Sequence, residues 1–211
     1  ILHPPAFDEP FWMARFNLDF SEVKVYCSTH LTSTPFHYPL DQILLMYILA
    51  HHHGVILHAA GITVNKQGFI FPGPSGAGKS TLARQFIKQK DKMRLILSDD
   101  RMIVRKINGS FVTFGTPWPG EEGIAVNKNV PLTAIFFLSH GRVNKIRELN
   151  HREVLEKLVR VTSIPWYDRA VMDNILLFCE DLITTIPCFS LSFMPDSRVV
   201  EFLKGISVNR I

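Results

Sequence analysis

The sequence predicts an α/β protein built around a glycine-rich loop, with a small strand region at the N-terminal end. Three observations carry this prediction. Strand-like and helix-like apolar patterns alternate along the chain. A Gly-x4-Gly-Lys-Ser sequence lies between one such strand and one such helix. Apolar residues make up 46% of the 211 residues, which is enough for a packed core.

The first 53 residues are expected to form strands and one helix that pack on the core. Residues 1–33 alternate loosely between apolar and polar side chains, which predicts short strands in a side sheet. Apolar residues repeat at helical spacing over 40–52, and Gly54 is expected to stop that helix. We therefore divide the chain into an N-terminal region, 1–53, and a domain that carries the loop, 54–211.

The domain that carries the loop is expected to contain several further strands and helices. Residues 55–63 and 68–71 are typical of strands joined by a hairpin turn, and a helix over 79–89 follows the loop. Asn108-Gly109 is a strong hairpin signal because both residues tolerate positive φ. The other predicted elements are strands at 95–97, 102–106, 110–114, 131–138 and 189–194, and helices over 154–162, 172–186 and 197–204.

Charge, apolar runs and cysteine content bear on the partners and the compartment of the protein. The net charge is +4 with Lys and Arg dispersed, so a solvated surface explains them better than a nucleic-acid interface does. No apolar run approaches the roughly 20 residues of a membrane-spanning helix, so we expect no membrane partner. Three cysteines without metal-ligand spacing predict free thiols in a reducing compartment, taken here as the cytoplasm. The chain begins Ile1-Leu2 without a methionine or a signal pattern, as expected of a trimmed N-terminus.

The Gly-x4-Gly-Lys-Ser sequence at residues 73–80 is the Walker A pattern. Its glycines allow positive φ, so successive N–H groups point at phosphate oxygens, and the following helix adds the positive end of its dipole. Lys79 is expected to reach the β- and γ-phosphates of ATP or another nucleoside triphosphate, and the Ser80 hydroxyl to bind Mg²⁺. The predicted nucleotide-binding residues are Gly73, Pro74, Ser75, Gly76, Ala77, Gly78, Lys79, Ser80 and Thr81.

Two adjacent aspartates, Asp99 and Asp100, follow the next predicted strand. A hydrophobic strand that ends in aspartate is how proteins with a Walker A loop bring a carboxylate to magnesium. Neighbouring residues of an extended segment point to opposite sides, so one carboxylate would face the metal and the other the attacking hydroxyl. The alternative is a polar strand end that leads into a turn.

Histidines at two of the places before the loop are candidates for a functional role. His58 lies within an apolar predicted strand, where a lone histidine is more often a hydrogen-bonded core residue than a catalytic one. His51, His52 and His53 lie at a predicted helix end, where solvated side chains that complement the helix dipole are the better explanation. From the residues alone, a catalytic His58 therefore remains a hypothesis.

These motifs together resemble HPr kinase/phosphorylase, which has phosphoenolpyruvate carboxykinase as a more distant structural relative. The resemblance rests on a strand histidine, His58, then the loop at residues 73–80, then Asp99-Asp100-Arg101, and it covers roughly residues 54–150. It implies a twisted mixed sheet of the HPr kinase and carboxykinase kind, and phosphoryl transfer from a nucleoside triphosphate to a serine hydroxyl. It also implies assembly into a homo-oligomer, although nothing in the sequence fixes the number of subunits.

The resemblance also implies roles for individual residues. Asp99 would accept the hydroxyl proton, and Asp100 would support magnesium or position that base. His58 would lie near the transferred phosphate together with Lys79. An acidic residue further along helps to bind magnesium in the family, and the nearest match here is Glu121 or Glu122. Arg147 would stand where the family has a phosphate-facing arginine.

One departure from the family bears on the substrate. The Glu-x-Arg-Gly pattern of HPr kinases is absent, and residues 115–121 instead resemble the HPr-kinase-related kinases found in biosynthetic gene clusters. The sequence therefore predicts an ATP- and Mg²⁺-dependent kinase whose hydroxyl-bearing acceptor is a peptide, a small protein or a small molecule.

A Walker A pattern also occurs in proteins with other functions. The main alternative is a nucleotide-binding regulatory module without transfer activity. An ABC-type ATPase ranks last because the Leu-Ser-Gly-Gly-Gln signature does not occur.

Overall fold

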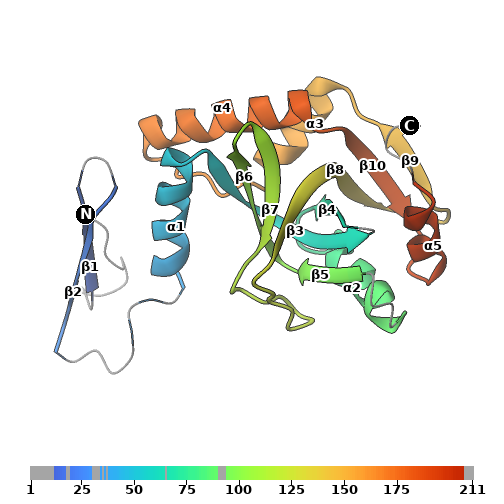
Figure 1. Ribbon diagram of the computed structural model, residues 1–211, viewed down its shortest axis with the longest axis horizontal. Coiled ribbons are helices and arrows are strands. Elements are labelled where there is room, and N and C mark those ends of the chain that lie inside the picture. Colours follow the sequence, from blue (N-terminus) through green and yellow to red (C-terminus); the bar gives the residue numbers. More distant parts are fainter. Residues whose placement is uncertain are drawn as a thin grey trace.

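The structure is a computed structural model that describes residues 12–17, 20–29, 34, 36, 38–64, 66–89 and 94–206. These residues form five helices and ten strands (Figure 1). The strands are β1 Trp12–Phe16, β2 Val23–Cys27, β3 Gly54–Val64, β4 Gln67–Pro72, β5 Arg94–Ser98, β6 Arg101–Ile107, β7 Ser110–Gly115, β8 Asn129–His140, β9 Lys145–Glu148 and β10 Cys188–Phe193. The helices are α1 Leu40–His51, α2 Lys79–Lys88, α3 His151–Val159, α4 Arg169–Thr185 and α5 Arg198–Lys204.

Eight strands form one mixed sheet, in the order β4-β3-β6-β7-β8-β10-β9, with β5 paired to β3. Most neighbours are antiparallel, whereas β8 runs parallel to both β4 and β10. Because β4 pairs with both β3 and β8, the strands β4, β3, β6, β7 and β8 close a ring. The predicted mixed α/β sheet is confirmed, and the ring closure was not predicted.

Strand β3 is buried on both faces of the sheet. Val55, Leu57 and Ala59 belong to one core cluster, which also contains side chains of α1, α3 and α4. Ala60 and Ile62 belong to the other cluster, which contains side chains of α2 and α5. The side chains of a strand alternate between the two faces of its sheet, so an almost continuously apolar strand has helices on both sides, as Figure 1 shows.

Local signals explain where several elements begin and turn. Asn108 and Gly109 have φ of 49° and 80°, as expected of the tight hairpin turn between β6 and β7. Helix α3 begins with a capping box, in which the Asn150 side chain accepts the Glu153 N–H and the Glu153 side chain accepts the Asn150 N–H. Helix α4 is capped at its N-terminal end by Asp168, whose carboxylate accepts the Val171 N–H.

The N-terminal strands lie beside α1 and form a two-stranded antiparallel sheet of their own (Figure 1). Trp12 and Ala14 of β1 pack on Leu40 and Leu44 of α1, so the predicted side sheet is confirmed for these residues. The rest of the predicted strand region, and Asn65 of the predicted turn, lie outside the described residues. The prediction for Gly54 was wrong: α1 ends at His51, and Gly54 is the first residue of β3. The division of the chain at residue 53 stays a prediction.

The last third of the chain agrees with the sequence-based prediction except at one strand. Strand β9 was not predicted, because its four residues are too few for a clear alternation of apolar and polar side chains. Helices α3, α4 and α5 lie within a few residues of their predicted positions.

Among the described residues, none of the helices has both the length and the apolar character that a membrane span requires.

The three cysteines differ strongly in accessibility, which predicts their reactivity. Cys27 is exposed, whereas Cys179 and Cys188 are buried. Burial raises the pKa of the Cys179 thiol to about 11 and that of Cys188 to about 12, so both stay protonated and shielded at pH 8. We expect a thiol reagent to modify Cys27 rapidly in the folded protein, and Cys179 and Cys188 only in urea. Cys27→Ser should remove the rapid phase, and a rapid phase that survives this change would contradict the assignment.

Candidate functional site

The glycine-rich loop, residues 73–80, joins the end of β4 to the start of α2. Gly76 and Gly78 have φ of 79° and 101°, values that favour glycine. Lys79 is the first residue of α2 and is only 7% exposed. Its Nζ donates hydrogen bonds to the carbonyls of Gly73 and Pro74, at 2.9 and 3.1 Å. The sequence thus folds into a strand, a loop with positive φ and a helix, as predicted.

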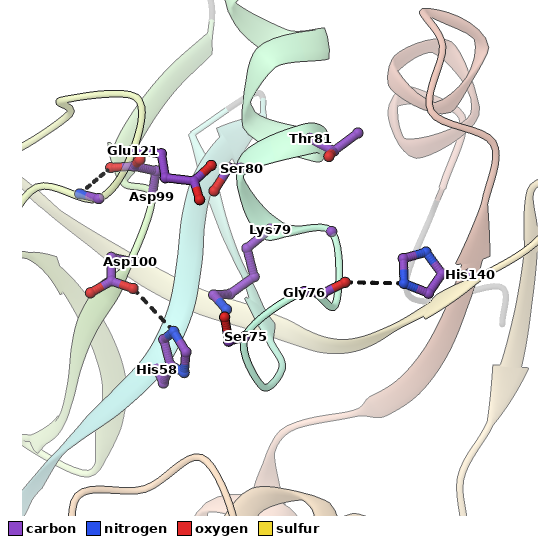
Figure 2. A pocket seen from close by; sticks show the side chains of 12 residues that line it. His58, Ser75, Gly76, Lys79, Ser80, Thr81, Asp99, Asp100, Glu121 and His140 are labelled. Carbon is purple, nitrogen blue, oxygen red and sulfur yellow. Dashed lines mark hydrogen bonds and ion pairs between the residues drawn. The ribbon is translucent and has the colours of Figure 1, made fainter.

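The loop borders a pocket of about 200 Å³ (Figure 2). Loop residues and residues from β3, from the turn after β5 and from the segment after β7 contribute to its wall. The lining residues are His58, Ser75, Gly76, Gly78, Lys79, Ser80, Thr81, Asp99, Asp100, Gly120, Glu121 and His140. All the residues predicted as catalytic or metal-binding therefore meet in one pocket, whereas Gly73, Pro74 and Ala77 line a second pocket on the loop.

Burial of Lys79 changes its acid–base properties. Loss of solvent lowers the pKa of the Lys79 ammonium below its ordinary value, and the nearby carboxylates of Asp100 and Glu121 oppose this shift. The amine therefore lies in an environment of low dielectric with two anions nearby. An anionic ligand in this pocket would interact with Lys79 more strongly than with an exposed lysine.

Asp99 and Asp100 form the turn between β5 and β6, and their side chains have different partners. Asp99 is 1% exposed, and its two carboxylate oxygens accept the N–H groups of Gly120 and Glu122, at 2.9 and 2.7 Å. A Cβ on Gly120 would lie 2.7 Å from Asp99 Oδ2, so this close approach requires glycine. Asp99 therefore fixes the segment after β7 at the pocket.

Asp100 pairs with His58 on the neighbouring strand. His58 Nε2 lies 3.0 Å from Asp100 Oδ1, and the two side chains are 33% and 30% exposed. Arg101 Nη1 contacts the other carboxylate oxygen at 3.4 Å. The hydrogen bond with His58 is the main reason that the pKa of Asp100 lies below its ordinary value of 3.8, and burial opposes that shift. Asp100 is thus a partly exposed carboxylate that faces the pocket.

Removal of the His58 side chain gives a first test of this pair. In His58→Ala we expect the pKa of Asp100 to rise towards 3.8, because its main cause of lowering is lost. The stabilisation from ionised Asp100 is present above its unfolded pKa and disappears as pH falls through the lower, folded value. The His58→Ala variant should lose this contribution of Asp100 to the free energy of unfolding. NMR titration of the Asp100 carboxyl carbon measures this shift, with His140→Ala as the control. An unchanged pKa in His58→Ala would refute the role of His58.

The segment after β7 is held from a second side by Arg84 of α2. Arg84 Nε lies 2.6 Å from Glu122 Oε1, and Arg84 Nη2 lies 3.3 Å from Glu121 Oε2. The Glu121 side chain is 75% exposed and the Glu122 side chain 15%. Of the two glutamates, only Glu121 lines the pocket, so Glu121 is the one available to a ligand there.

Figure 2 shows Ser80, Asp99 and Glu121 towards one end of the pocket and Asp100 with His58 towards the other. Hydroxyl and carboxylate oxygens are the ligands that Mg²⁺ prefers, usually one or two carboxylates completed by water and phosphate. The first group therefore fits magnesium in chemical type. The described residues contain no group of three or more His, Cys, Asp or Glu side chains that would bind a metal by themselves.

Two residues differ from the sequence-based expectation. Arg147 does not line the pocket: it lies on β9, where its guanidinium contacts Glu153 at 2.8 and 3.1 Å. His140 was not predicted as a site residue, yet its Nε2 lies 3.0 Å from the Gly76 carbonyl oxygen in the loop. No signal in the sequence links two residues this far apart, because only the pairing of β8 with β4 brings the end of β8 to the loop.

Comparisons with known proteins concern a family model, curated proteins and solved structures. No curated protein matches the chain. Among solved structures, the HPr(Ser) kinase/phosphatase from Coxiella burnetii has 10% identity and a TM-score of 0.41, over 74% of this chain and 89% of that chain. The model of the family described as SynChlorMet cassette protein ScmC matches residues 40–198. Because this match spans most of the chain, the protein belongs to the ScmC family of SynChlorMet cassette proteins.

Proposed function

We propose that this protein is a kinase that transfers the γ-phosphoryl group of ATP, or of another nucleoside triphosphate, to the hydroxyl of a peptide, a small protein or a small molecule. One observation carries the proposal: a buried lysine at a helix start, a strand histidine and two aspartates line one pocket. Phosphoryl transfer depends on positioning and on neutralisation of charge, and these residue types supply both.

The phosphates would bind to the loop at residues 73–80. The positive φ of Gly76 and Gly78 turns this backbone sharply, and the N-terminal end of α2 adds its dipole. Lys79 would exchange its hydrogen bonds to the Gly73 and Pro74 carbonyls for bonds to phosphate oxygens. Because Lys79 is already desolvated, this exchange would recover favourable interactions of the ammonium group.

Magnesium would bind at the end of the pocket that contains Ser80, Asp99 and Glu121. When bound, the ion would neutralise the charge of the phosphate oxygens. Glu121 would have to leave Arg84, an exposed contact of 3.3 Å that is readily exchanged. Asp99 would hold the segment of Glu121 in place through its bonds to the Gly120 and Glu122 N–H groups.

Asp100, with His58, is proposed as the group that accepts the hydroxyl proton. This reverses the roles that the resemblance to HPr kinases implies for the two aspartates. Both oxygens of Asp99 already accept backbone N–H groups and the residue is buried, whereas Asp100 is partly exposed to the pocket. The acceptor oxygen would form a bond to the γ-phosphorus, the bond from phosphorus to the bridging oxygen would break, and the proton would pass to Asp100. The products are a phosphate ester and a nucleoside diphosphate.

Incubation with labelled ATP, Mg²⁺ and a panel of hydroxyl-bearing acceptors tests the proposal. The expected result is a labelled phosphate ester on the acceptor, formed by the wild-type protein and not by Lys79→Ala. Label that binds but reaches no acceptor would instead support the regulatory module. Failure of the protein to bind nucleotide at all would contradict both functions.

A further inference from the structure

A second pocket, of about 520 Å³, lies against the first part of the glycine-rich loop. It is lined by residues 72–77 at the loop, 137–140 of β8, and Lys157, Arg160 and Val161 at the end of α3. Lys79, Ser80 and Thr81 do not line it, so it is distinct from the pocket that contains the catalytic side chains. The two pockets share Ser75, Gly76 and His140, so they adjoin at the loop.

The chemistry of this second pocket is apolar with a cationic rim. Phe137, Leu138 and Val161 contribute apolar surface. Lys157 lies in the last turn of α3 and Arg160 directly follows the helix with helical φ and ψ, so the two exposed residues, three apart, lie on one side. Within the described part of the chain neither forms a salt bridge, whereas Arg152 of the same helix pairs with Glu156 at 2.9 Å. The rim therefore offers positive charge to a ligand.

The wall of this pocket is joined to the strand that carries His58. The Val161 carbonyl accepts the His58 N–H at 2.7 Å, and the Ile56 carbonyl accepts the Ser163 N–H at 2.9 Å. The Gly73 N–H donates to the His58 carbonyl at 3.2 Å. The end of α3, the loop and the strand of His58 are thus held together by backbone hydrogen bonds, so a ligand against Val161 lies next to the catalytic strand.

We propose that the second pocket binds the acceptor, and that the acceptor carries an apolar group and an anionic group beside its hydroxyl. This inference rests on the proposed kinase function and adds the chemical class of its substrate. A volume of about 520 Å³ suits a small molecule or one or two residues of a peptide. The two cations favour an anion over the neutral base of a nucleotide. Lys157 and Arg160 are specificity-determining residues in this account.

Two matched dipeptides test the assignment, N-acetyl-seryl-phenylalanine with its free carboxylate and the same compound as its C-terminal amide. NMR titration of the ¹⁵N-labelled protein with Mg-ADP present should shift the backbone signals of Phe137, Arg160 and Val161. The acid should bind about tenfold more tightly than the amide, as expected of one charge-assisted contact. In the double variant Lys157→Glu and Arg160→Glu this preference should disappear, whereas Arg152→Glu should keep it.

The outcomes separate this inference from the proposed function. Equal binding of acid and amide, shifts elsewhere in the protein, or no saturable binding of either compound would overturn the acceptor pocket. Loss of Mg-ADP affinity in the double variant, with acid binding retained, would show that the pocket binds the nucleoside instead. If the acid binds as expected but receives no phosphate from ATP, the anion site stands and the kinase function fails.

Discussion

Replacement of Asp100 by asparagine is expected to lower the rate of phosphoryl transfer by about 10²–10⁴-fold, the range of general base catalysis, with little change in Mg-nucleotide affinity. Asparagine keeps the shape of aspartate and a hydrogen-bond acceptor for His58, so the pocket should persist. It cannot accept the hydroxyl proton. Single-turnover transfer from labelled ATP, with nucleotide affinity measured on the same sample, separates the two effects.

Asp99→Asn is the matched control for this experiment. Asparagine would place an NH₂ group against the N–H of Gly120 or Glu122, both of which now donate to Asp99. The segment that carries Glu121 should loosen, and the Mg²⁺ concentration needed for half-maximal transfer should rise. If Asp99→Asn lowers the rate at saturating Mg²⁺ while Asp100→Asn does not, the base is Asp99, as the resemblance to HPr kinases implies.

Gly115→Ala is expected to have the largest effect on stability. Gly115 ends β7, and a Cβ there would lie 2.1 Å from the Val126 carbonyl oxygen and 2.7 Å from that of Leu97. Both contacts are with backbone atoms, and these two backbone segments are tied together by a hydrogen bond from the Val126 N–H to the Leu97 carbonyl at 3.1 Å, so they cannot move aside without breaking it. We expect a loss of at least about 2 kcal/mol in the free energy of unfolding, in the range of overpacked cores, measured by urea denaturation.

Gly205→Ala provides the comparison for that measurement. Gly205 has φ of −73°, and its added Cβ would meet nothing closer than 3.6 Å. Its effect on the free energy of unfolding should stay within about 0.5 kcal/mol, as for surface substitutions. Equal shifts in the urea midpoint for the two glycine variants would contradict the close packing at Gly115.

Local patterns in the sequence predicted most elements and the loop. Asn108-Gly109 specifies its hairpin through positive φ, and the apolar strand at β3 specifies burial on both faces. The loop at residues 73–80 is recognisable because glycine, lysine and serine occur at fixed spacing next to a strand and a helix. Such signals act within about a dozen residues, so they do not depend on the rest of the fold.

The features that escaped prediction depend on contacts between distant residues. The ring closed by β4 and β8, the contact of His140 with Gly76, and the bonds of Arg84 to the segment after β7 join residues far apart in the chain. The different surroundings of Asp99 and Asp100 also depend on tertiary structure, because the segment that donates to Asp99 comes after β7. Arg147 was expected at the phosphates, and its position beside Glu153 follows from the pairing of β9 with β10.

Equilibrium titration of the protein with a fluorescent ATP analogue, with and without Mg²⁺, tests the central claim most directly. The loop at residues 73–80 is predicted to bind the phosphates through Lys79 and Mg²⁺ through Ser80. We expect saturable binding that Mg²⁺ strengthens, a loss of about 10²-fold or more in affinity for Lys79→Ala, as for a buried charged contact, and loss of the Mg²⁺ effect in Ser80→Ala. Binding that is unchanged in Lys79→Ala would contradict the claim that this loop holds the phosphates.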